Sequence, residues 1–142
     1  MEHFYKFLIV LSTLYLVTES LADDNVEAMK KALFDVCSNK YPISDAIKND
    51  AKKGILSEDR NFKCFMMCSL DELSLINPET AEIDGETMIS MMPNEEVQKH
   101  IKPIIDQCLP NIAGKPDACE VAYNFVKCGL TINPSATMIL PF

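Results

Sequence analysis

The chain has 142 residues, of which 48% are hydrophobic and 24% are charged, with a formal net charge of -8 at pH 7. This length fits one compact domain and leaves no room for separate catalytic and accessory domains. The acidic balance argues against a nucleic-acid-binding protein, because phosphate binding needs clustered basic residues. Here the longest basic runs are Lys30-Lys31 and Lys52-Lys53.

The first 22 residues have the pattern of a secretory signal peptide. Lys6 precedes an apolar run from Phe7 to Val17, and Ser20 and Ala22 supply the small residues expected before a cleavage site. The run is too short to span a membrane, which takes about 20 residues. We therefore expect cleavage after Ala22 and a secreted, extracellular domain over residues 23–142 that is not embedded in a membrane.

The first half of this domain has helical periodicity. A first helix is predicted from the apolar positions Val26, Met29, Leu33 and Val36, with Asp24 and Glu27 as a capping pair. Ser44 can cap a short second helix that ends at Gly54. A third helix is predicted from Glu58 to about Leu73. Its side chains Phe62, Phe65, Met66 and Leu73 fall on one side, nearly opposite Cys64 and Cys68.

The second half continues the helical pattern after an interruption. Residues 75–85 contain Pro78 and Gly85 without a clean period, which predicts a loop before a short helix from Glu86 to Met92. Asn94 can cap a helix from Glu95 to Cys108, which Pro103 should bend. The apolar face of that helix comprises Val97, Ile101, Ile104, Ile105 and Cys108. Residues 110–116 form a connector before a last helix from Asp117 to Cys128. No strand pattern competes, so the fold class is all-α, with about six helices.

Six cysteines lie in the predicted secreted domain. An even number in an oxidising compartment implies three disulfides, although the spacing alone does not select a pairing. A zinc site is disfavoured because His100 is the domain's one histidine and no Cys-x2-Cys pair is present. We therefore expect no metal and no cofactor. Paired cysteines also leave no thiolate for catalysis.

The placement of the cysteines suggests how they act. Cys64 and Cys68 lie one turn apart on one helix face, so each should reach a different neighbour. Cys119 and Cys128 project from opposite sides of the last helix, which would be held from both sides. A chain cross-linked in this way can give up some interior packing without unfolding, which allows an internal cavity.

The cysteine spacing carries a family resemblance. The gaps between successive cysteines are 26, 3, 39, 10 and 8 residues, and the sequences around Cys64 (Lys63-Cys64-Phe65) and Cys119 (Asp117-Ala118-Cys119-Glu120) agree with the same pattern. This arrangement resembles the insect odorant-binding proteins, the pheromone-binding and general-odorant-binding family. The resemblance implies the pairs Cys37–Cys68, Cys64–Cys119 and Cys108–Cys128, and a compact helical bundle around an apolar cavity.

The resemblance also implies a function. Members of this family carry small hydrophobic odorants or pheromones, volatile or lipid-like, through the lymph of sensory hairs to olfactory receptors on neuronal membranes. We expect a monomer or weak homodimer with no nucleic-acid partner. The alternative is a carrier of the same fold in venom, saliva or reproductive fluid, which the sequence does not separate from olfaction.

A set of apolar side chains can form the walls of such a cavity. Met and Phe make adaptable walls that suit several ligand shapes. The expected ligand-binding residues are Phe62, Phe65, Met66, Met88, Met91, Met92, Ile101, Ile104, Val121, Ala122 and Phe125. The alternative is that these residues form only a packed core. Tyr123 lies on a different face of its helix from Phe125, so we expect it to be partly exposed.

An enzyme is disfavoured because the carboxylates lie in consecutive pairs that diverge, such as Asp71-Glu72, instead of converging on a cleft. No nucleophile or metalloprotease motif is present. A toxin or protease inhibitor would usually show denser cysteines.

His100 is expected to be a solvated surface residue and not a pH switch.

The last 14 residues, 129–142, form an uncharged apolar tail. Gly129, Pro134 and Pro141 discourage a helix, so an extended segment is predicted. We expect this tail to cross the domain as a pocket wall or lid, with Met138, Leu140 and Phe142 buried against the ligand.

Overall fold

The computed structural model describes residues 24–92 and 94–142, so the predicted signal peptide lies outside it. In chain order the elements are an N-terminal helix (24–40), α2 (Asp45–Lys52), α3 (Arg60–Glu72), α4 (Gly85–Ser90), α5 (Glu95–Ile112), α6 (Ala118–Ile132) and the 3-10 helix η1 (Pro134–Ile139). This confirms the all-α prediction and the six predicted α-helices. No helix in the described ranges is long and apolar enough to cross a membrane.

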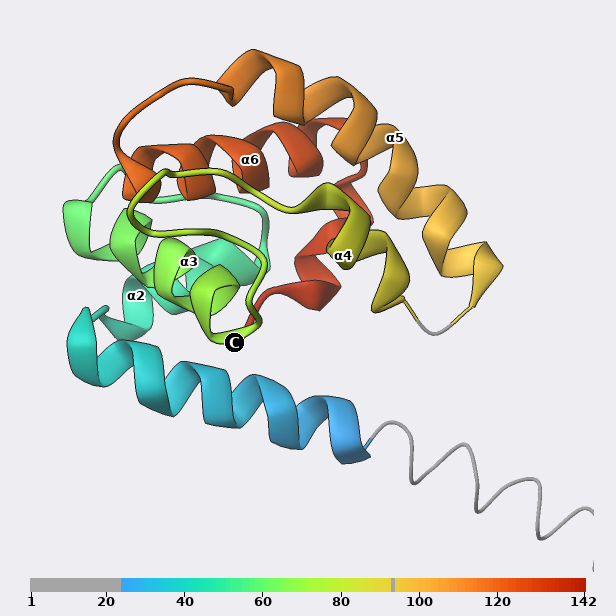
Figure 1. Cartoon of the computed structure of the whole chain (residues 1–142). Helices are drawn as coiled ribbons and strands as arrows, with labels where there is room; N and C mark the ends of the chain where they lie inside the picture. The colour runs from blue at the N-terminus through green and yellow to red at the C-terminus, as the bar shows by residue number, and fades with distance from the viewer. Residues whose placement is uncertain (1–23, 93) are drawn as a thin grey trace, which may run out of the picture.

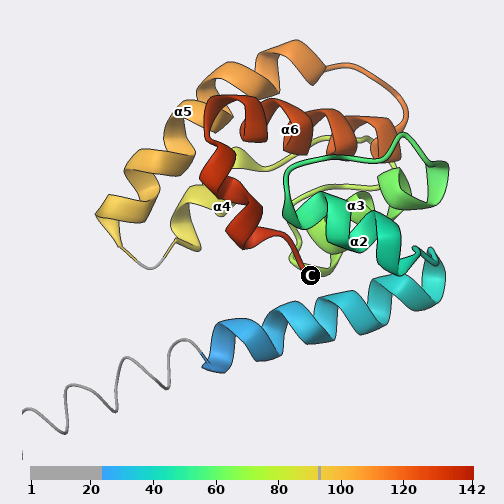
Figure 2. The same cartoon turned by 180° about the vertical axis from the view of Figure 1, so that it is seen from behind.

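Helix α6 is the centre of the arrangement. It packs against α3 on one side and α5 on the other, and η1 turns away from its C-terminal end towards the N-terminal helix (Figure 1). The N-terminal helix lies along the opposite edge of the domain, and the C-terminal end of the chain reaches the space between that helix and α3 in both views (Figure 2). Segments from both ends of the chain therefore meet at α3.

Polar side chains begin the helices as the sequence predicts. Ser44 Oγ accepts a hydrogen bond from the amide of Ile47 at the start of α2, and Asn94 Oδ1 accepts one from Val97 at the start of α5. At the start of α6, Asp117 Oδ1 accepts bonds from the amides of residues 119 and 120. Each cap satisfies amides that have no partner within the helix.

Helix α4 ends at Ser90 and not at the predicted Met92, and helix α5 ends later than predicted. Helix α5 was expected to stop at Cys108 but continues through Pro110 to Ile112, whose side chain is buried. Both Pro103 and Pro110 lie inside this helix, which changes direction along its length in Figure 1, in line with the expected bend. A proline removes one backbone hydrogen bond, and here burial of the last turn offsets that loss.

The extended tail was also a wrong prediction. Helix α6 continues past Gly129 to Ile132, and η1 follows directly. Gly129 does not end the helix. Its missing side chain lets α5 approach, because a Cβ there would lie 3.2 Å from Ile104 Cγ2. Asn133 then starts η1, where its Oδ1 accepts a hydrogen bond from the Ser135 amide.

The three disulfides have the pairing that the resemblance implies. Cys37–Cys68 joins the N-terminal helix to α3, Cys64–Cys119 joins α3 to α6, and Cys108–Cys128 joins α5 to α6. All six cysteines are paired. Cys64 and Cys68 thus reach different neighbours, and α6 is held from both sides, as their spacing predicts.

Candidate functional site

Most of the predicted ligand-binding residues meet in one buried apolar cluster. From the helices it contains Phe62, Phe65, Met66, Met88, Ile101, Ile104, Val121, Ala122 and Phe125, and from the tail it contains Leu140. Met92 and Phe142 are half-buried against this cluster. The structure therefore brings together twelve of the fourteen predicted side chains, from α3, α4, α5, α6 and the tail.

Two predicted residues lie outside the cluster. Met138 is 72% exposed and Met91 is 48% exposed. The expected burial of Met138 is wrong because η1 turns this part of the tail so that residues 138 and 139 face solvent, while Leu140 is buried. Met91 follows the last residue of the short helix α4 and does not reach the interior.

An aromatic cluster connects the tail to the interior. The Phe142 ring lies nearly parallel to the rings of Phe65 and Phe62, with centroid distances of 5.6 and 6.3 Å. Phe34, from the N-terminal helix, contacts the same group, 5.7 Å from Phe65 and 6.4 Å from Phe142. Three separate segments thus contribute rings to one wall of the interior.

This wall contains a residue that the sequence analysis missed. Phe34 was not among the predicted ligand-binding residues, yet it lies one turn before Cys37, which is bonded to α3. That spacing places both side chains on the helix face that meets the domain. Val26, Met29 and Val36, which defined the predicted helix, are exposed on another side.

The interior is almost free of polar side chains. Ser69 is the buried polar residue of the described ranges, and its hydroxyl donates to the backbone oxygen of Phe65 at 2.9 Å. In the same ranges no three His, Cys, Asp or Glu residues are grouped so that they could hold a metal ion. A molecule held in this interior would therefore meet hydrocarbon and sulfur atoms.

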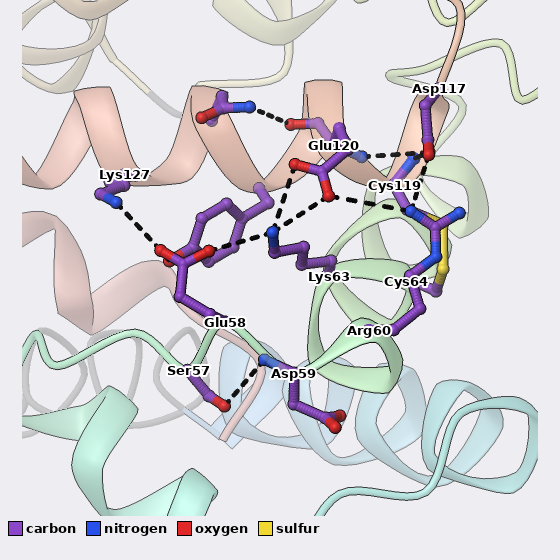
Figure 3. A network of polar contacts seen from close by, with 12 residues as sticks. Ser57, Glu58, Asp59, Arg60, Lys63, Cys64, Asp117, Cys119, Glu120 and Lys127 are labelled. Atoms are coloured by element: carbon purple, nitrogen blue, oxygen red, sulfur yellow. Dashed lines mark hydrogen bonds and ion pairs between the residues drawn. A yellow bond between two sulfur atoms is a disulfide. The ribbon is translucent and has the colours of Figure 1, made fainter.

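A network of charged groups joins α3 to α6 at the surface (Figure 3). Lys63 Nζ lies 3.0 Å from carboxylate oxygens of both Glu58 and Glu120, and Arg60 Nη1 lies 2.7 Å from Asp117 Oδ2. The Cys64–Cys119 disulfide connects the same two helices beside these pairs. This network positions α6, which supplies one wall of the apolar interior.

Tyr123 belongs to this network, contrary to the expected partial exposure. Its side chain is only 2% exposed, and its hydroxyl donates to Glu58 Oε1 at 2.8 Å. Burial and the bond to Glu58 raise the pKa of Tyr123 to about 12. Hydrogen bonds from Lys63, Tyr123 and Lys127 lower the pKa of Glu58 to about 2. The sequence did not reveal this contact because Glu58 and Tyr123 are 65 residues apart.

A separate open cleft of about 990 Å³ lies between the loop over residues 74–84 and the end of α5. The loop is closed by an antiparallel bridge between Ile76 and Ile83, and the Asn77 side chain accepts bonds from the amides of residues 79 and 80. Of the predicted ligand-binding residues, Val121 alone lines this cleft. Leu75, Ile76 and Ile112 of its lining also belong to the core cluster, so the cleft borders the apolar interior and is a second candidate site.

The comparison with protein families decides the family of this chain. The model of the PBP/GOBP family matches residues 19–131, which include every cysteine and all of α2 to α5. The chain belongs to the PBP/GOBP family. Its members are odorant-binding carriers of small hydrophobic ligands, not enzymes. The match ends before η1 and the aromatic end of the tail.

Curated proteins agree with the family assignment. General odorant-binding protein 72 of Anopheles gambiae is 24% identical over 121 residues, which cover 81% of this chain and 96% of that protein. General odorant-binding protein 69a of Drosophila melanogaster is 34% identical over 98 residues, which cover 68% of this chain and 64% of that protein.

A solved structure shows the same fold. Odorant binding protein 7 from Anopheles gambiae, solved in complex with an azo compound, matches with a TM-score of 0.73 and 21% identity over 84% of this chain and 97% of that one. That protein has four disulfide bridges. Three are formed in the part of the present chain that the structure describes.

Proposed function

We propose that this protein is a carrier that holds a small hydrophobic ligand in the apolar interior between α3, α4, α5, α6 and the tail. The observation that carries this proposal is the convergence of Phe, Met and Ile side chains from these segments with no buried Asp, Glu, Lys, Arg or His among the described residues. An apolar ligand gains about 25 cal/mol for each Å² of apolar surface that it buries. Such a lining gives affinity without demanding one ligand shape.

The composition of the interior supports a range of ligands. Met66 on α3, Met88 on α4 and Met92 just after α4 can change rotamer, since methionine is unbranched and flexible. Phe62 and Phe65 provide flat surfaces at α3. We propose that ligand entry displaces the methionines while the three disulfides hold the helices in place.

We further propose that the ligand is an odorant or pheromone that the protein carries, after secretion, through sensory lymph to a membrane receptor. Support comes from the family and from the signal-peptide pattern of residues 1–22. Detecting the protein in antennal sensory hairs by immunolabelling tests this role. Detection only in a gland or its secretion would replace it with the non-olfactory carrier.

Displacement of an uncharged fluorescent hydrocarbon tests the binding proposal. Diphenylhexatriene should become fluorescent with the secreted, disulfide-bonded protein, and apolar volatiles should displace it. Phe65→Ala should weaken probe binding because it removes a fully buried ring from the interior, whereas Met91→Ala changes an exposed side chain and serves as the matched control. Absence of probe binding in the folded protein would overturn the proposal.

A further inference from the structure

The open cleft beside the loop over residues 74–84 differs in charge from the apolar interior. Four of its lining residues are acidic, namely Asp71, Glu79, Glu82 and Asp84. Among the residues that the structure describes, no Lys, Arg or His lines it. Elsewhere on the domain basic side chains balance carboxylates, as Lys40 does at Glu72 and Lys63 does between Glu58 and Glu120.

None of the four rim carboxylates forms an ion pair within the described ranges. Asp84 accepts hydrogen bonds from the amide and hydroxyl of Thr87 at 2.9 and 2.7 Å, which lower its pKa and keep it ionised. Glu82 receives only a 3.4 Å contact from the Thr80 hydroxyl, and Glu79 is exposed. Lys40 lies close enough to Asp71 for the two charges to interact, whereas Glu79, Glu82 and Asp84 form no ion pair with a described residue and give the cleft a local negative charge.

The floor of the same cleft is apolar. Pro78, Ile83 and Leu109 line it and keep part of their surface exposed, whereas Ile76 and Val121 in the same lining are almost fully buried. The cleft volume of about 990 Å³ lies at the upper end of the range for sites that enclose small organic molecules. An apolar floor below an acidic rim matches a ligand with a hydrocarbon body and one positive charge.

We propose that this cleft is a second binding site, which takes organic ammonium ions with a small apolar body. The apolar part would lie on the half-exposed side chains of Ile83 and Leu109, and the ammonium group would face the rim carboxylates of Glu79 and Glu82. The negative charge of the rim favours a cationic ligand. It would repel a carboxylate ligand, and it would add no electrostatic attraction for a neutral one.

A matched pair of ligands tests the charge requirement. We expect 2-phenylethylamine to bind the intact protein more tightly than 2-phenylethanol, which has the same carbon skeleton without the charge, in isothermal titration calorimetry at low salt. Amine binding should weaken as salt rises, because exposed ion pairs are screened, while binding of the alcohol should change little. Equal affinities for the two ligands, or amine binding that is insensitive to salt, would overturn the second site.

A matched pair of variants tests the location. Glu79→Gln/Glu82→Gln should weaken amine binding about tenfold by removing two charged acceptors. Asp45→Asn/Glu95→Gln changes the net charge equally but alters α2 and the opposite end of α5, so it should leave the affinity within about twofold of the wild type. An equal loss of amine affinity in both variants would mean that the net charge of the protein, and not the rim of the cleft, attracts the amine. The proposal would then be wrong. If a double variant misfolds, the single variants Glu82→Gln and Glu95→Gln, both at exposed positions, make the same comparison.

The site is independent of the proposed carrier function. Saturating 2-phenylethylamine should leave diphenylhexatriene in place, because the two ligands occupy different sites. Full displacement of the hydrocarbon by the amine would place both in the interior and remove the second site. If the hydrocarbon fails to bind but the amine binds as described, the carrier proposal fails and this one stands.

Discussion

The hydroxyl of Tyr123 donates a hydrogen bond of 2.8 Å to Oε1 of Glu58 and so joins α6 to the residue just before the cap of α3. Lys63 and Lys127 lie over the same tyrosine ring, with Nζ 4.8 and 5.5 Å from its centroid. Both ammonium groups also contact Glu58. The Tyr123 ring therefore packs in the apolar contact between α3 and α6, while its hydroxyl bonds to the charged network at the surface of the same two helices.

The first prediction concerns this hydroxyl. Tyr123→Phe should lower the free energy of unfolding by about 1 kcal/mol, because it removes one hydrogen bond to a charged acceptor and keeps the ring in place. Urea unfolding followed by circular dichroism measures the change. Tyr41→Phe is the control, since the Tyr41 hydroxyl has no hydrogen bond among the described residues. Equal stability of Tyr123→Phe and wild type would show that the bond contributes nothing.

The second prediction concerns acid pH. The pKa of Glu58 falls from 4.5 to about 2 in the folded protein, so the stability that this carboxylate contributes is complete above pH 4.5 and is lost as the pH falls towards 2. Glu58→Gln should therefore reduce the slope of unfolding free energy against pH in that window. Part of the slope should remain, because the pKa values of Asp84 and Asp117 are also lowered. An unchanged slope would contradict the role of Glu58.

Alkaline pH gives the opposite sign at Tyr123. Its folded pKa is raised from 10.0 to about 12, so its contribution is complete below pH 10 and is lost between pH 10 and 12. Tyr123→Phe should therefore show a weaker loss of stability in this alkaline window than the wild type does. A loss equal to that of the wild type would assign the alkaline transition to other groups.

The third prediction concerns His100, which is exposed on α5 with its Nε2 3.8 Å from Glu96. Its side chain is 65% exposed and does not belong to the apolar interior. His100→Ala should leave the pH dependence of diphenylhexatriene binding unchanged between about pH 5 and pH 8, the range in which histidine changes charge. Loss of an acid response in this variant would make His100 a switch.

The fourth prediction concerns the contact between α4 and α5. A Cβ at Gly85 would lie 2.7 Å from Ile105 Cγ2 and 2.9 Å from Leu109 Cδ1, so α5 packs directly on the α4 backbone. Gly85→Ala should destabilise the protein by about 1–3 kcal/mol through this overlap. Ser90→Ala, at an exposed position of the same helix, is the control. Equal unfolding midpoints for the two variants would show that the contact relaxes without cost.

The sequence was sufficient for features that depend on local or family patterns. The caps Ser44, Asn94 and Asp117 were predictable because each side chain bonds amides only two or three residues away. The disulfide pairing followed from the family resemblance, since spacing left the alternatives open. Buried positions such as Phe62 and Ile104 followed from helical periodicity.

Features that depend on distant contacts were not predictable. The buried hydroxyl of Tyr123 depends on Glu58 as its acceptor, and the close approach of α5 to Gly129 involves Ile104, 25 residues away along the chain. Periodicity of the N-terminal helix indicated Val26 and Met29, whereas the Cys37–Cys68 bridge turns Phe34 towards the domain. The acidic cleft combines the loop over residues 74–84 with the end of α5, which no sequence motif connects.

The last prediction concerns the end of the tail. Leu140 is buried and the Phe142 ring lies on Phe62 and Phe65, so these side chains can close the interior over a bound ligand. Deleting residues 140–142 should leave the helical signal and the disulfides intact, because the last cysteine is Cys128. It should speed dissociation of diphenylhexatriene about tenfold, which corresponds to losing roughly 1.4 kcal/mol of apolar contact.

The matched control for this deletion lies in the same tail. Met138→Ala/Ile139→Ala changes two side chains that are 72% and 64% exposed, so it should leave the dissociation rate of the probe unchanged. Stopped-flow measurement of fluorescence decay after mixing with empty acceptor vesicles gives the rates. Equal rates in the deletion and the wild type would mean that the tail is an outer layer without ligand contact. Slower release and tighter binding after the deletion would show that Phe142 occupies space that the ligand needs, which contradicts its role as a lid.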